Sequence, residues 1–204
     1  RCWHAGTVLP LPGVQTASAE RTIVELGSGL RPRLPMDGAV FVDVSETACR
    51  KLARRGARAI CGSVAMLPFR TGTLGAVHAY DLLEHLEDDV AAVGELARVL
   101  APGAHLVLST PLHEGRWQPF DRVVGHARRY EPAALLALLA RHGFALDAFA
   151  PFGVRPRSGL LNQLGVYYLT HWPRLALRCE EIFLRLARHT DRVLVVRRAD
   201  DAMF

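Results

Sequence analysis

The chain has 204 residues and a formal net charge of +5 at pH 7, with 50% hydrophobic and 22% charged residues. This composition fits one globular domain with a substantial core and excludes a disordered chain. The positive charge does not indicate nucleic-acid binding, because it comes from arginines dispersed along the chain, with Lys51 as the sole lysine, and no basic run is interleaved with aromatic residues.

The cysteines and the hydropathy pattern predict a cytoplasmic protein. The cysteines are scattered, at Cys2, Cys49, Cys61 and Cys179, without a Cys-x-x-Cys pair, so neither a zinc site nor a disulfide framework is expected. No apolar stretch approaches the about 18 residues that a membrane span needs, and the start shows no signal-peptide pattern. Because the chain begins at Arg1 rather than at Met, we expect that residues precede it.

The first strong signal along the chain is a strand that runs into a glycine bend. Residues 1–21 hold prolines and glycines without periodicity and predict an N-terminal loop or cap. Residues 22–26 then predict a buried strand with Glu25 near its carboxyl end, followed by Gly27-Ser28-Gly29. Glycine lacks a Cβ and tolerates positive φ, so this bend favours close approach of a ligand to the backbone.

A second strand places another acid beside the first. Residues 39–43 predict an apolar strand ending in Asp43, 18 positions after Glu25 and close to the about 20-residue offset at which a strand-end carboxylate binds a ribose. Two neighbouring strands with acids at their ends predict a nucleoside site. The bend is followed by Arg31-Pro32, where no good helix can start, whereas a dinucleotide pyrophosphate needs a helix N-terminus there. The pattern therefore favours a nucleoside cofactor without phosphates.

Strands and helices alternate along the rest of the chain. A helix is expected from the Ser45 cap to Arg55, ending at Gly56. A second is expected from Asp88 or Asp89 to Pro102-Gly103, and its apolar positions are Val90, Val93, Ala97 and Leu100. A third begins at Pro132 and ends at Gly143. Further strands are expected at residues 57–61, 76–80, 106–108, 144–152 and 192–197. Together these elements predict an α/β fold, a doubly wound sheet with helices on both faces.

Six short motifs resemble those of class I S-adenosylmethionine-dependent methyltransferases, in the same order and spacing. They are Val24 to Gly29, Val42 to Ser45, Leu67 to Phe69, Asp81 to Leu86, Leu100 to Ala104 and Gly143-Phe144. The resemblance covers residues 22–152 and is greatest to small-molecule enzymes such as the ubiquinone-pathway methyltransferases. It implies a single Rossmann-like domain over residues 1–204, with a mostly parallel sheet and an antiparallel last strand.

The resemblance also implies S-adenosylmethionine as the cofactor. Its methionine moiety would be lined by Glu25, Gly27, Ser28 and Gly29, and its ribose hydroxyls would be held by Asp43. Adenine would lie against Val44, with Ser63 and Val64 at its edge. The predicted cofactor-binding residues also include Asp81 and Leu82. Ser63 stands where relatives commonly carry an acid, and a hydroxyl is the weaker acceptor. Adenine would therefore rely more on apolar contact with Val44, Val64 and Met66.

His85 and His126 are the candidate catalytic residues. Methyl transfer from a sulfonium needs mainly alignment, water exclusion and, for a protonated acceptor, a base. His85 follows Asp81 by about one helical turn, so one helix would bring both to the site, and an imidazole accepts a proton near neutral pH. An alternative of equal weight is that His85 and Glu84 only stabilise this short helix. By resemblance, a divalent cation is a further alternative, because the spacing of Asp81, Glu84 and His85 matches that with which ubiquinone-pathway enzymes hold one. A site without metal is the favoured prediction.

Two insertions are expected on the acceptor side. In residues 111–131, the candidate stretch is Asp121 to Tyr130. Its part from Gly125 to Tyr130 resembles a Gly-His-x-Arg-Arg-Tyr motif of relatives in which this connection borders the acceptor. Arg128 or Arg129 would bind an anionic group, and His113, His126 or Tyr130 would act as base; alternatively, these residues tie the loop to the domain. Residues 153–191 predict a helix from Pro173 that packs on the domain or, as the weaker alternative, contacts a membrane surface.

These observations predict methyl transfer from S-adenosylmethionine to a small organic acceptor, in secondary or quinone-like metabolism. The alternative function is that of a partner subunit that binds the cofactor without turnover. This alternative stays open because Ser63, Arg31 and the short loop after Gly29 depart from the family pattern. A nicotinamide-dependent oxidoreductase is disfavoured, because Arg31-Pro32 occupies the place of the closing glycine. The sequence predicts no nucleic-acid partner and no particular oligomeric state.

Overall fold

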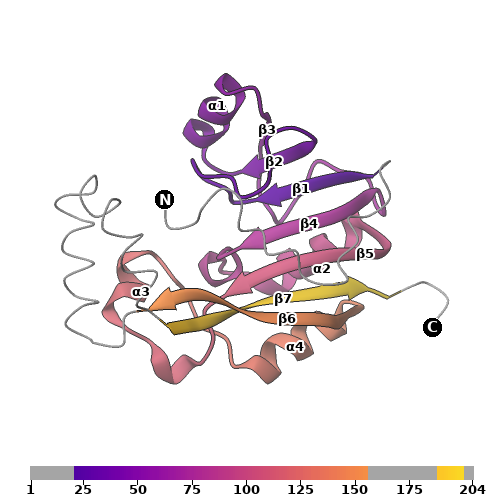
Figure 1. The fold of residues 1–204 in the computed structure, drawn as a ribbon. Coiled ribbons are helices and arrows are strands. Elements are labelled where there is room, and N and C mark those ends of the chain that lie inside the picture. The colour runs from indigo at the N-terminus through magenta and orange to yellow at the C-terminus, as the bar shows by residue number, and fades with distance from the viewer. Residues whose placement is uncertain (1–20, 156–187, 200–204) are drawn as a thin grey trace.

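The fold is built on a mixed sheet. The structure is a computed structural model, and it describes residues 21–155 and 188–199. Within these residues the strands form one 7-stranded sheet in the order β3-β2-β1-β4-β5-β7-β6 (Figure 1). Neighbouring strands from β3 to β5 pair in parallel, whereas β7 pairs antiparallel with both β5 and β6. The predicted α/β sheet with an antiparallel last strand is therefore confirmed.

The elements follow one another as alternating strands and helices. The strands are β1 (Thr22–Leu26), β2 (Ala39–Asp43), β3 (Arg58–Cys61), β4 (Leu74–Tyr80), β5 (Leu100–Thr110), β6 (Phe144–Arg155) and β7 (Arg188–Arg198). The α-helices are α1 (Glu46–Arg54), α2 (Asp89–Val99), α3 (Pro119–Val123) and α4 (Pro132–Arg141), and two short 3₁₀ turns are η1 (Leu83–His85) and η2 (Glu114–Arg116).

Helices cover both faces of the sheet. Successive residues of a strand point to opposite faces. In β2, Val40 and Val42 belong to the large buried cluster that includes the apolar side chains of α2 and α4. Phe41, on the other face, packs with Leu52 of α1. Figure 1 shows α1 beside β2 and β3, and α4 beside β6.

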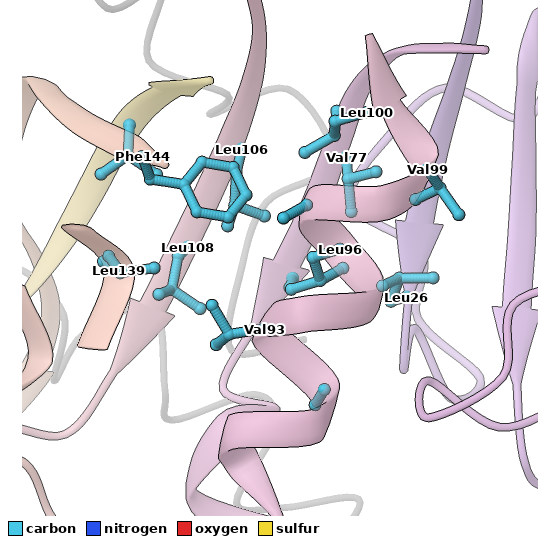
Figure 2. Close-up of a cluster of buried hydrophobic side chains, with 14 of the residues drawn as sticks. Leu26, Val77, Val93, Leu96, Val99, Leu100, Leu106, Leu108, Leu139 and Phe144 are labelled. Atoms are coloured by element: carbon cyan, nitrogen blue, oxygen red, sulfur yellow. The ribbon is translucent and has the colours of Figure 1, made fainter. Parts of the chain in front are cut away.

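The large cluster holds the middle of the sheet to its helices. Figure 2 shows Val93 and Leu96 of α2 lying against the sheet, with Leu106 and Leu108 of β5 beside them. These four side chains are fully buried. Burial of each apolar side chain of this size stabilises a fold by about 1.5–3 kcal/mol. This packing fixes the strand ends from which the functional residues project.

Helix ends agree with the signals in the sequence. The side chain of Ser45 accepts a hydrogen bond from the backbone N–H of Ala48, and α1 ends before Gly56. Asp88 caps α2 in the same way, through the N–H of Ala91. Pro132 occupies the first turn of α4, where its missing N–H costs nothing. The three predicted helices are therefore confirmed, apart from the end of α2.

The end of α2 and the start of β5 differ from the prediction. The helix ends at Val99, and β5 begins at Leu100 and runs through Pro102-Gly103, instead of spanning only residues 106–108. Leu100 is fully buried and pairs with Leu74 of β4, so tertiary packing draws it into the sheet. The register shift beyond Leu74 accommodates the Pro-Gly pair. Val90, predicted on the apolar face of α2, is largely exposed.

Several predicted segments lie outside the described residues. These are nearly all of the cap at residues 1–21 and the helix expected from Pro173. The two ends of the 153–191 insertion, residues 153–155 and 188–191, instead prolong β6 and β7. Among the helices that the structure describes, none has the length and apolar character to span a membrane.

Candidate active site

The functional residues gather where the parallel strands end. In the sheet register, Leu26 of β1 lies beside Val42 of β2 on one side and Ala79 of β4 on the other. The carboxyl ends of these strands therefore share one edge, which is where α/β sheets bind ligands. Three acids stand at this edge: Glu25, Asp43 and Asp81.

Asp43 links the glycine bend to the start of α1. Its Oδ2 accepts a hydrogen bond from the N–H of Gly29 at 2.8 Å, and its Oδ1 accepts one from the N–H of Ser45 at 2.8 Å. Gly29 has a φ of 56°, a left-handed conformation that favours glycine. Because a carboxylate has about four lone-pair positions, Asp43 can accept further hydrogen bonds from a ligand.

Glu25 holds the connection between β1 and β2. The carboxylate is 2% exposed and accepts hydrogen bonds from the N–H of Arg33, at 2.9 Å to each oxygen, and from the N–H of Leu34 at 2.7 Å. Burial raises the pKa of Glu25, and the two N–H groups oppose this rise. Residues 27–38 contain no helix, which confirms the prediction made from Arg31-Pro32.

Leu82 packs against one of the two glycines of the bend. Gly27 has a φ of 64°, and its N–H donates to the carbonyl of Val42 at 2.9 Å. A Cβ on Gly27 would lie 2.9 Å from Cδ1 of Leu82, so no side chain fits without displacing Leu82. Next in the chain, the buried Oγ of Ser28 has no hydrogen-bond partner among the residues that the structure describes. A buried hydroxyl of this kind is costly unless a polar ligand satisfies it.

Exposed apolar side chains lie beyond Asp43, on the expected adenine side. Val44 and Met66 are each 79% exposed, and Val64 is partly buried against the core. The Oγ of Ser63 accepts a hydrogen bond from the N–H of Ala65 at 3.2 Å, so the side chain stabilises its own turn. The structure therefore leaves Val44 and Met66 available for contact with a ligand ring.

Asp81 does not belong to a helix with His85, contrary to the prediction. Its φ is 48°, and only residues 83–85 form the 3₁₀ turn η1. The reason is that Asp81 is held by other partners: Oδ1 accepts from Oγ of Ser109 at 2.8 Å, and Oδ2 accepts from Nη2 of Arg33 at 3.0 Å. The guanidinium carbon of Arg33 lies 4.4 Å from the centre of the Tyr80 ring.

A second group of charged residues lies in the connection after β5. Asp121 is fully buried, and Arg129, 2% exposed, donates to both of its oxygens, with N···O distances of 2.7–2.9 Å. Burial by itself raises the pKa of Asp121, but hydrogen bonds from Arg129, the N–H of Gln118 and His126 outweigh it and lower the pKa. Asp121 is therefore a carboxylate.

The Asp121 carboxylate orients His126. Nδ1 of His126 lies 2.9 Å from Oδ1 of Asp121, which indicates that Nδ1 carries the proton and donates. Burial lowers the pKa of His126 below its ordinary value, although Asp121 opposes this change. The ring is thus neutral near pH 7, with Nε2 as the basic nitrogen and 4.0 Å from Oε1 of Glu84.

His85 lies beside His126. The two rings meet edge to face with their centres 4.8 Å apart, and Nδ1 of His85 is 3.1 Å from the carbonyl of Gly125. Among the residues that the structure describes, Glu84, His85 and His126 form a group that could hold a metal ion, with ligand atoms within 4.8 Å of one another. Asp81, named in the predicted cation set, is not in this group. The structure therefore brings the two candidate catalytic histidines together.

The other candidates in this connection tie it to the domain. Arg128 donates to the carbonyls of Leu86 and Glu87 and pairs with Asp89. The hydroxyl of Tyr130 donates to Asp89 at 2.7 Å, and burial raises its pKa. A group that is buried and protonated in this way is unsuited to act as base. His113 lies 3.6 Å from Glu131, outside the pair of candidate catalytic histidines.

The sequence predicts no individual role for two residues at this edge, although one of them, Asp121, begins the predicted acceptor-side stretch. Asp121 orients His126 from five positions earlier, a spacing that carries no general signal. Arg33 reaches Asp81 from 48 positions earlier, and nothing in its sequence neighbourhood predicts that contact. Both act through side-chain contacts that only the folded chain creates.

Comparison with known proteins covers part of this edge, with Asp43 and Asp81 but without Glu25. Residues 28–108 match a family model described as a methyltransferase domain. A protein of Mycolicibacterium smegmatis, named a probable S-adenosylmethionine-dependent methyltransferase, is 33% identical over 90 residues, which are 42% of this chain and 34% of the relative. The chain thus spans about a third of the length of this curated relative.

Solved structures share the fold. One is an S-adenosylmethionine-dependent methyltransferase of Thermotoga maritima, with a TM-score of 0.55 and 23% identity, covering 64% of this chain and 65% of that one. Another is geranyl diphosphate C-methyltransferase of Streptomyces coelicolor, with a TM-score of 0.65 and 14% identity, covering 90% and 76% of the two chains. That structure holds Mg²⁺, geranyl diphosphate and S-adenosylhomocysteine.

Proposed function

Because the chain carries a class I S-adenosylmethionine-dependent methyltransferase domain, we propose that it transfers a methyl group from S-adenosylmethionine to a small organic acceptor. The observation that carries this proposal is the pair of acids at the ends of β1 and β2. Glu25 and Asp43 flank a bend in which Gly27 and Gly29 both have positive φ. This arrangement suits a nucleoside cofactor.

The residues at this edge fit S-adenosylmethionine. Asp43 has lone pairs for two ribose hydroxyls, and the exposed Val44 offers an apolar surface to adenine, with Ser63 and Val64 at its edge. The unpartnered hydroxyl of Ser28 would find a partner in the methionine end. Glu25, Gly27, Gly29, Asp81 and Leu82 complete the proposed cofactor site. When bound, the cofactor supplies an electrophilic methyl group on a sulfonium.

His126 is the proposed proton acceptor. Asp121 fixes its tautomer, and its pKa below the ordinary value keeps Nε2 unprotonated near pH 7. A base of this kind accelerates transfer to an acceptor hydroxyl or amine by typically about 10²–10⁴-fold. We assign His85 the supporting role, because its ring packs on His126 and its Nδ1 is bound to the main chain.

The rival function is a cofactor-binding subunit without turnover. The buried Arg129–Asp121–His126 series disfavours it, because cofactor binding alone gives no reason to orient a basic nitrogen. A methyl-release assay with candidate phenol, amine and carbon acceptors distinguishes the two functions. We expect S-adenosylhomocysteine to form with at least one acceptor class when the chain is assayed alone. Turnover only after addition of a co-purifying protein would favour the subunit.

A further inference from the structure

Arg33 spans the edge between β1 and β4. Its backbone N–H is fixed by the buried carboxylate of Glu25, and its guanidinium donates to Asp81 at 3.0 Å. The same guanidinium lies over the face of Tyr80, and the Arg33 side chain is 19% exposed. A cation held by an acid on one side and an aromatic face on the other keeps a defined position. Its place in the fold is therefore set by three separate contacts.

The position of Arg33 relative to Asp43 is informative. Strand β1 lies between β2 and β4, so Asp43 stands on one flank of the glycine bend and the Arg33–Asp81 pair stands on the other. A ligand whose ribose is bound by Asp43 and which crosses the bend would bring its far end to β4. The far end of S-adenosylmethionine is an amino acid, with an ammonium and a carboxylate.

Arg33 supplies the positive charge that complements the carboxylate of that amino acid. Asp81, whose side chain is 41% exposed, suits the ammonium group, but acids would repel the carboxylate. A guanidinium carries N–H donors in a planar fork that binds a carboxylate with two parallel hydrogen bonds. Resting on the proposed function, we infer that Arg33 binds the carboxylate of the methionine moiety and thereby selects cofactors that retain it. Asp81 then exchanges part of its contact with Arg33 for the cofactor ammonium.

The test combines removal of the Arg33 guanidinium with removal of the carboxylate from the ligand. Calorimetry measures the affinity of wild type and of Arg33→Met for S-adenosylhomocysteine and for S-adenosyl-3-thiopropylamine, the same molecule without its carboxylate. We expect wild type to prefer S-adenosylhomocysteine by about 10- to 100-fold, the usual worth of a charge-assisted hydrogen bond. In Arg33→Met this preference is lost, because only S-adenosylhomocysteine binds more weakly. The ligand without the carboxylate is bound as before.

Two further variants serve as controls. Arg31→Met removes an exposed arginine of the same connection and should leave both affinities unchanged. Arg33→Lys keeps the charge without the fork and should retain part of the preference. Thermal unfolding of each variant establishes that it is folded.

Three results would overturn the inference. Tighter binding of S-adenosylhomocysteine by Arg33→Met would mean that the side chain obstructs the site. Equal weakening of both ligands would mean that Arg33 only shapes the loop. If wild type bound neither ligand, the proposed function would fail, and the inference with it.

Discussion

The two halves of the site hold their acids by different means. At the ends of β1 and β2, Glu25 and Asp43 are bound by backbone N–H groups of the glycine bend and its connection. In the 111–131 connection, Asp121 is bound mainly by the side chains of Arg129 and His126. The first half therefore depends on backbone shape and the second on residue identity. Substitutions should affect the two halves in correspondingly different ways.

The largest expected effect comes from removing the base. His126→Gln should lower turnover by about 10²–10⁴-fold, the typical contribution of a general base. It should leave the affinity for S-adenosylhomocysteine unchanged, because His126 belongs to the other half of the site. His85→Gln is the matched control and should lower turnover less. Steady-state kinetics with calorimetry measures both quantities, and full turnover in both variants would mean that alignment alone drives the reaction.

Next in size is the loss of the buried ion pair. Arg129→Met leaves Asp121 buried without its cation, which should destabilise the fold by about 3–5 kcal/mol. Urea unfolding gives the free energy of unfolding. Arg50→Met removes an exposed arginine whose partner Glu46 lies one turn away, and exposed pairs of this kind are worth about 0.3–0.5 kcal/mol. A similar decrease in the free energy of unfolding in the two variants would contradict the claim that the second half depends on the Arg129–Asp121 pair.

A smaller loss of stability is expected from a substitution in the glycine bend, where the first half of the site depends on backbone shape. Gly27→Ala forces a side chain into a left-handed conformation, at about 1–2 kcal/mol, and against Leu82. Gly56→Ala has the same conformational cost, but no atom of the described part of the chain lies within 4 Å of the added Cβ. Both should unfold at a lower temperature than wild type, and only Gly27→Ala should also lose affinity for S-adenosylhomocysteine. Retained affinity in Gly27→Ala would separate the bend from the cofactor site.

The pH dependence sharpens the comparison further. A lowered pKa of His126 means that its basic form persists below its ordinary pKa of 6.5. The acid limb of kcat/KM should therefore lie below pH 6.5, with activity lost as the pH falls through the folded-state value. The limb should disappear in His126→Gln. An acid limb above pH 6.5, or one that survives this substitution, would show that another group titrates.

The smallest effect expected is that of chelation. If His126 acts as a base, turnover is unchanged after exhaustive treatment with a chelator, because Glu84, His85 and His126 then need no cation. Inactivation by the chelator and recovery with a divalent cation would mean that these three residues hold a metal instead.

The same contrast between the two halves explains which features of the site the sequence predicts. Glu25 and Asp43 were predicted because strand ends and glycine bends leave local patterns, and both contacts are made to the backbone nearby. The orientation of His126 by Asp121 and the contact of Arg33 with Asp81 join side chains whose spacing is set by the folded sheet. The positive φ of Asp81 likewise reflects its partners Ser109 and Arg33, and no local pattern predicts it.

The most direct test of the cofactor site is a calorimetric titration with S-adenosylhomocysteine, comparing wild type with Asp43→Ala. The account predicts that wild type binds with a 1:1 stoichiometry, and that the variant, still folded by thermal unfolding, binds about 10- to 100-fold more weakly because two hydrogen bonds to a carboxylate are lost. Equal affinity of the two proteins, or tighter binding of NAD than of S-adenosylhomocysteine by wild type, would contradict it.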